Sequence, residues 1–278
     1  MKHNTKKVVL ILMVFLSIFS MFGCESKDEK AAKRIVEALQ EKYGKEFVVD
    51  SIGGGWGTMN SNTLKAIVKP KNDPSINVAV EITKDLKDVY DNYLNQAIAK
   101  AAVQPISEMA NSIWGESRVE VSNDTGMTYP EHSDTNMSYE QFLKLYPMNR
   151  QLVEVFLNCE RYIDGNGGMD QQAEIDKFKT FAQKLADHKY MRSSIYIWYI
   201  TPDAYDRFDE AINSDMSVLD YYKDEEEKQG KLNVVTANGI KIDNQGRIVT
   251  TNEEMYESFD TWKDERLKST KLKGDLHD

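Results

Sequence analysis

The chain has 278 residues, which is enough for one large domain or two smaller domains with hydrophobic cores. Apolar residues make up 41% of it, charged residues 29%, and the mean hydropathy of -0.56 excludes a protein with several membrane spans. Its formal net charge is -10, from 35 basic and 45 acidic residues. Phosphate backbones repel so acidic a chain, and nucleic acid is therefore not expected as a partner.

The first 23 residues have the composition of a signal peptide. Lys2, Lys6 and Lys7 form a positively charged start, and an apolar run without charged residues follows from Val8 to Phe22. This run is shorter than the ~17–25 residues that a membrane-spanning helix needs. It ends at Gly23-Cys24, after which the chain becomes highly charged. These features predict export from the cytoplasm.

The end of this segment resembles the lipobox of bacterial lipoproteins, in which a small residue directly precedes an invariant cysteine. Gly23 and Cys24 match that pattern, whereas Met21 stands where leucine is usual and Phe22 where a small residue is usual. The resemblance implies that diacylglycerol is attached to the Cys24 thiol and that signal peptidase II cleaves between Gly23 and Cys24. Several acyl chains hold a protein firmly, since each buried CH₂ contributes roughly 0.8 kcal/mol. An uncleaved anchor and plain secretion are the alternatives.

Cleavage before Cys24 removes three lysines and leaves 32 basic against 45 acidic residues, a net charge of -13. We expect the mature protein on the extracytoplasmic face of the cell membrane, held there by its lipid. No cofactor is expected besides this covalent lipid. The frequent use of lysine, asparagine, isoleucine and tyrosine suggests a low-GC Gram-positive source.

An α+β fold is predicted, and its first half is a small antiparallel sheet packed by helices. Ser26 and Glu29 form a capping box for a helix over 27–43 that Gly44 ends. A further helix is expected over 93–114, which Pro105 should kink or divide. Strands are predicted over 47–52, 62–68, 76–82 and 118–121.

Residues 122–138 are polar and rich in turn formers, and they show no periodicity. Such a stretch is longer than an ordinary connection and predicts a linker between domains. The expected domains are therefore residues 24–121 and residues 139–267, with a frayed tail over 268–278.

The second half is predicted to be a mixed α/β domain. Ser138 and Gln141 cap a helix over 139–145, and Thr201 with Pro202 begins a later helix. The turn signals Asn238-Gly239 and Asn244-Gln245-Gly246 predict that 232–251 forms short hairpin strands. The other expected elements are strands over 152–159 and 195–200, a helix over 169–187, and a closing helix with Met255, Phe259 and Trp262.

The glycine-rich segment Gly53-Gly54-Gly55-Trp56-Gly57 follows a predicted strand. A phosphate-binding loop needs a helix directly afterwards and a Lys-Ser/Thr pair, and both are missing here. The segment is therefore interpreted as a connection between strands. Trp56 is a possible aromatic contact for a sugar, a peptide or a partner.

No metal site is predicted. The run from Asp164 to Asp170 is typical of a calcium loop in composition, but an EF-hand needs glycine at its sixth position and glutamate at its twelfth. Met169 and Ile175 stand there, so we expect a turn that leads into a helix, with an irregular calcium site as the alternative. The histidines have no spacing that would suit zinc.

No catalytic residue is predicted from the sequence. Cys159 ends an apolar run and is interpreted as a small core residue, without a disulfide partner once Cys24 carries lipid. The leading hypothesis is a non-catalytic binding module with a protein or cell-envelope partner. The alternatives are the substrate-binding lipoprotein of an importer and an envelope hydrolase without a recognisable motif. A deep cleft would favour a ligand, and clustered carboxylates with perturbed pKa values near a pocket would favour an enzyme.

Overall fold

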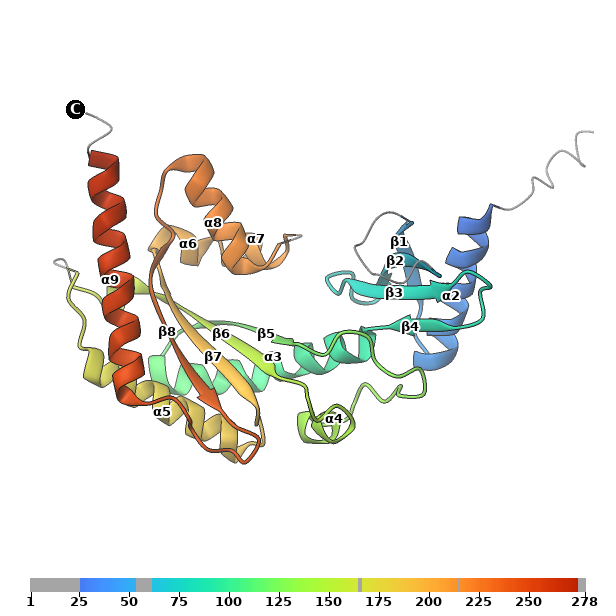
Figure 1. The fold of residues 1–278 in the computed structure, drawn as a ribbon, viewed down its shortest axis with the longest axis horizontal. Helices are drawn as coiled ribbons and strands as arrows, with labels where there is room; N and C mark the ends of the chain where they lie inside the picture. The colour runs from blue at the N-terminus through green and yellow to red at the C-terminus, as the bar shows by residue number, and fades with distance from the viewer. Residues whose placement is uncertain (1–25, 54–61, 165–166, 215, 275–278) are drawn as a thin grey trace, which may run out of the picture. The chain divides into compact units, whose positions relative to one another are not determined.

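The computed structural model describes residues 26–53, 62–164, 167–214 and 216–274, with side chains up to residue 263 (Figure 1). The described part is α+β with two four-stranded sheets, which confirms the predicted fold class. Contacts divide the chain into two compact units. The first unit comprises the described residues up to Asp91 together with the short segment Tyr129–Glu131. The second comprises Asn92–Thr128 and the described residues from His132 onward.

The first unit is an antiparallel sheet in the order β1-β2-β3-β4, covered by helix α2 (Lys27–Tyr43). The strands are β1 (Phe47–Ile52), β2 (Thr63–Pro70), β3 (Val78–Thr83) and β4 (Val89–Asp91). The predicted capping box and the left-handed Gly44 cap are both present in α2. Ala31, Ile35 and Leu39 are buried along one face of α2, and they form a core with alternate residues of the strands, such as Val68, Val78 and Val80.

The second unit contains a mixed sheet in the order β5-β6-β7-β8. Its strands are β5 (Arg118–Asn123), β6 (Gln151–Asn158), β7 (Ser193–Ile200) and β8 (Val234–Ile242). The pair β6 and β7 is parallel, and the two outer pairs are antiparallel. A parallel pair needs a crossover connection, which helix α5 (Gln171–Asp187) supplies.

Helices cover both faces of this second sheet (Figure 1). On one face, α3 (Tyr93–Trp114), α5 and α9 (Asn252–Gly274) pack against inward residues of the strands, such as Val155 and Ile197. On the other, α6 (Pro202–Asp206), α7 (Phe208–Ile212) and α8 (Val218–Gln229) pack against Phe156, Trp198 and Ile200. Further short elements are helix α4 (Tyr139–Leu145) and the 3-10 turn η1 (Cys159–Arg161).

The division of the chain differs from the predicted domains 24–121 and 139–267. Strand β5 pairs with β6 and α3 packs on the second sheet, so both belong to the second unit. Most of the expected linker, residues 122–138, also belongs to the second unit, so it is not the boundary. The physical reason is that the apolar side chains Ile106 and Ala110 of α3 are buried in one core with β5 and α5.

One local prediction needs correction, and a second is narrowed. Asn238-Gly239 is not a turn but the middle of β8, where the Asn238 side chain donates a hydrogen bond to the Met255 carbonyl (2.6 Å). Helix α3 continues through Pro105, so the predicted division is excluded and the predicted kink stays a prediction. The carbonyl that Pro105 leaves without its helical hydrogen bond belongs to Ala101, which is exposed, so water can satisfy it.

Within the described residues, no helix combines the length and the apolar character that crossing a membrane requires.

Candidate functional site

A pair of glutamates lies on the face of the second sheet that α6, α7 and α8 partly cover. Glu120 on β5 is directly opposite Glu154 on the antiparallel strand β6. Directly opposite residues have Cβ atoms about 4.5–5.5 Å apart, so the two carboxyl groups are neighbours. Successive side chains of a strand point to opposite faces of the sheet. Val119, Val121 and Val153 are buried in the core on one face, so Glu120 and Glu154 lie on the other.

A hydrogen-bond donor lies beside each carboxyl group. Trp198 donates its indole N–H to Glu154 Oε1 (3.0 Å), and the backbone N–H of Val218 donates to Glu120. Val218 is the first residue of α8, so Glu120 lies at the amino-terminal end of that helix. The second oxygen of Glu120, Oε2, is buried and has no hydrogen-bond partner within the described residues.

Burial is the main cause that raises the pKa of both groups, and a neighbouring carboxylate raises each further. Desolvation is the main cause of the raised pKa of Glu120, about 7; the charge of Glu154 raises it further, and the Val218 N–H opposes the shift. The pKa of Glu154 is raised by burial and by Asp220, whereas the hydrogen bond from Trp198 lowers it. The pair therefore retains a proton up to near-neutral pH.

Two stacked aromatic side chains continue the same face next to the glutamates. Tyr196 and Trp198 of β7 have ring centroids 5.9 Å apart at an interplanar angle of 24°, and Tyr196 is 36% exposed. Tyr196 is opposite Gly239 on β8, and a Cβ at Gly239 would lie 3.2 Å from the Tyr196 ring. The glycine therefore makes room for the ring. We call Glu120, Glu154, Tyr196 and Trp198 the glutamate–aromatic face.

This face can bind a cation or exchange a proton. Carboxylates attract a positive group, and the faces of tyrosine and tryptophan rings do the same. A carboxyl group whose pKa is near 7 also suits general acid–base chemistry. The two glutamates lie side by side on neighbouring strands, whereas a glycosidase requires carboxylates that face each other across a cleft.

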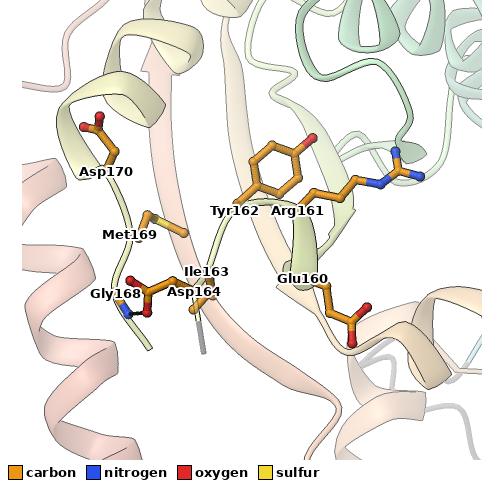
Figure 2. A pocket seen from close by; sticks show the side chains of 8 residues that line it. All are labelled: Glu160, Arg161, Tyr162, Ile163, Asp164, Gly168, Met169 and Asp170. Carbon is orange, nitrogen blue, oxygen red and sulfur yellow. Dashed lines mark hydrogen bonds between the residues drawn. The ribbon is translucent and has the colours of Figure 1, made fainter. Parts of the chain in front are cut away.

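Residues 160–164 and 168–170 border an open hollow of about 560 Å³ (Figure 2). Asp164 Oδ1 accepts a hydrogen bond from the Gly168 backbone N–H (2.9 Å), and Asp170 caps α5 by accepting one from the Ala173 N–H (3.0 Å). The predicted turn into a helix is confirmed at Asp170. Among the residues that the structure describes, no group of three His, Cys, Asp or Glu side chains could hold a metal ion.

The other residues singled out in the sequence lie apart from the glutamate–aromatic face. Gly23, Cys24 and Trp56 are outside the described residues, so the predicted lipidation, cleavage and aromatic contact stay predictions. Cys159 lies at the start of η1, after the end of β6, and is partly buried against the core of the second unit. His188 ends α5, with its ring Nδ1 2.9 Å from the Lys184 carbonyl oxygen.

Sequence reasoning missed Glu120 and Glu154. In both strands an acidic residue stands between two valines, a pattern that ordinarily places the acid in solvent. What changes their environment is α8, which comes much later in the chain. The sequence does contain one indication of the pair, because two strands of one sheet each carry a glutamate on the face that points away from the core.

Comparison with known proteins assigns no family to the chain. No protein-family model matches it, and no curated protein does. A solved structure with a similar arrangement is the crystal structure of a DUF5037 family protein from Ruminococcus gnavus, with a TM-score of 0.49 and 14% sequence identity. The match covers 82% of this chain and 98% of that one. A similarity at this level supports no statement about function.

Proposed function

We propose that this chain is a lipid-anchored extracytoplasmic binding protein whose glutamate–aromatic face takes a cationic group, such as a lysine or arginine side chain of a protein or cell-envelope partner. The anchor is proposed on the sequence alone, from the lysines and apolar run before Gly23-Cys24. The binding role is supported by one observation above all: Glu120 and Glu154 are adjacent, half-buried and next to the exposed Tyr196 ring.

The chemistry of the face favours a cation. Two neighbouring carboxylates repel each other when both are ionised, and a proton relieves this repulsion near neutral pH. A lysine ammonium or an arginine guanidinium placed between them would relieve it equally well and would displace the proton. The aromatic rings add attraction for the same charge. The net charge of -13 on the chain after cleavage before Cys24 would also speed the approach of a basic partner.

The anchor is tested by metabolic labelling with a fatty acid in cells that express the full chain or Cys24→Ala. The native chain should incorporate label and be processed, whereas Cys24→Ala should accumulate as a heavier precursor without label. Label retained by Cys24→Ala would place the acyl group elsewhere and refute the proposed anchor.

The binding role is tested by titrating the full chain with a trilysine peptide and with the same peptide acetylated on its side chains. The affinity for trilysine should rise between pH 5.5 and pH 8, because the peptide competes with a proton. Glu154→Gln should weaken binding about tenfold or more, the effect of losing a charge-assisted contact. Glu227→Gln is the matched control, since Glu227 is exposed on the far end of α8. Equal binding of the acetylated peptide would refute the role.

One observation favours a second candidate, an envelope hydrolase. The raised pKa of Glu120, about 7, is suited to a general acid. Release of nitrophenol from a panel of nitrophenyl esters and glycosides tests it. Turnover that Glu120→Gln abolishes and Glu227→Gln preserves would replace the binding role by a catalytic one.

A further inference from the structure

A second concave site lies in the second unit, away from the glutamate–aromatic face. It is a pocket of about 250 Å³ between α3, the start of α4 and the end of α5. Its apolar wall is formed by Ile98, Ala101 and Ala102 from α3 and by Met137 before α4, and the polar residues Ser138 and His188 also line it. Tyr139 and Tyr190 also line it, and their rings stack with centroids 5.8 Å apart at an angle of 25°. We call it the tyrosine pocket.

The size of the tyrosine pocket limits its ligand. Pockets for drug-sized molecules begin at about 300 Å³, so a smaller molecule with one ring or a short branched chain is the matching size. The apolar walls and the tyrosine rings select an apolar body. A ligand of this kind needs one polar group to fix its orientation, and that group must suit the charges at the rim.

Lys189 is a positively charged residue that lines the pocket. Glu140, which also lines the pocket, forms an exposed ion pair with Lys144 (3.3 Å), which offsets part of its charge. Lys189 is exposed and makes no ion pair with any side chain that the structure describes. A carboxylate is the ligand group that complements it, because the ion pair and the hydrogen bonds to an ammonium group act together.

The backbone of Lys189 adopts a conformation that is unusual for a residue with a side chain, as it also is at Leu86 and Arg192. Helix α5 ends in a Schellman motif: the Lys189 N–H donates to the Ala186 carbonyl (3.0 Å) and the Tyr190 N–H to the Leu185 carbonyl (2.9 Å). Lys189 has a φ of 68°, in the left-handed region, where glycine is the usual residue. A lysine is strained there, so stability alone would favour glycine.

We propose that the tyrosine pocket binds a small organic carboxylate, with its apolar body between Ile98, Met137 and the tyrosines and its carboxylate paired with Lys189. The site is separate from the glutamate–aromatic face in its residues and in the charge it selects. Its test therefore does not depend on the proposed function.

Isothermal titration of the full chain with benzoate and with benzamide, its neutral isostere, tests the proposal. The native chain should bind benzoate about tenfold or more tighter than benzamide, the effect of one charge-assisted contact. Lys189→Gly should bind both equally weakly, while its melting temperature stays the same or rises because the strain at φ 68° is relieved. Lys179→Ala, on α5 and outside the pocket, should behave as the native chain does.

A further variant tests the location. Ala101→Trp, at an exposed position on α3, fills the pocket without entering the core and should abolish benzoate binding. Three outcomes would overturn the proposal: no binding of benzoate by the native chain, equal affinity for benzamide, or benzoate affinity that Lys189→Gly or Ala101→Trp leaves unchanged.

Discussion

At the scale of single residues, the protonation of Glu120 couples the chemistry of the candidate site to stability. The pKa of Glu120 is about 7 in the folded protein, against an ordinary 4.5 that applies in the unfolded chain. Below pH 4.5 both states are protonated and the group costs nothing. Between pH 4.5 and pH 7 the unfolded chain releases the proton while the folded protein keeps it, so the folded protein loses stability as the pH rises.

Glu120→Gln should remove this part of the pH dependence. The native chain is expected to lose at most about 3 kcal/mol of unfolding free energy from this group between pH 4.5 and pH 8, since a tenfold change in proton affinity corresponds to about 1.4 kcal/mol. Urea unfolding of the two chains at a series of pH values measures the difference, which should grow in favour of the variant as the pH rises. Glu227→Gln should follow the native profile. Parallel profiles for native and Glu120→Gln would contradict the raised pKa.

At the scale of elements, α8 determines the environment of the glutamate pair. Its first N–H, at Val218, contacts Glu120, and Glu226 near its end accepts the N–H groups of Asn233 (2.6 Å) and Val234 (2.9 Å). The helix is thus fixed to β5 at one end and to the start of β8 at the other. A helix held at both ends can keep carboxyl groups beneath its first turn away from water.

The elements that the sequence predicts well are those whose determinants are local. Ser26 with Glu29 and Thr201 with Pro202 lie within one turn of the helices that they begin, and the structure confirms both starts. The glutamate pair forms only because β5 pairs with β6 and because α8, later in the chain, packs over them. Neither contact can be predicted from the sequence of a single helix or strand. The turn prediction at Asn238-Gly239 was wrong for the same reason, since these residues pair with Ile197 and Tyr196 on another strand, β7.

Helix α3 leads to a prediction at the same scale. Pro105 interrupts the hydrogen bonding of α3 at Ala101, and proline is about 3 kcal/mol less favourable than alanine inside a helix. Part of this is offset because proline also restricts the unfolded chain, by about 0.4–1 kcal/mol. Pro105→Ala should therefore raise the free energy of unfolding by roughly 2–2.6 kcal/mol, as measured in urea. A decrease would mean that the surrounding side chains require the proline.

At the scale of the whole molecule, each compact unit has its own buried core and its own sheet. The first unit also holds a buried ion pair: Lys42 Nζ is 2.8 Å from Asp91 Oδ2, and the Tyr43 hydroxyl donates to Asp91 Oδ1 (2.7 Å). This arrangement joins the end of α2 to the end of β4. Both partners of the ion pair are on the first unit, so its loss should act on that unit's stability.

Calorimetry of the full chain should therefore resolve two unfolding transitions, and Asp91→Ala should lower only one of them. Removing one partner of a buried ion pair leaves the other charge buried and costs about 3–5 kcal/mol. The Lys42 side chain is only 12% exposed, so that penalty applies to it. Glu46→Ala, which removes an exposed partner of Lys71, should cost less than about 1 kcal/mol and is the control. A single transition, or an equal shift of both, would contradict this prediction. It would show that the two cores unfold cooperatively, because the stability lost at Asp91 can affect the second sheet only if both units unfold together.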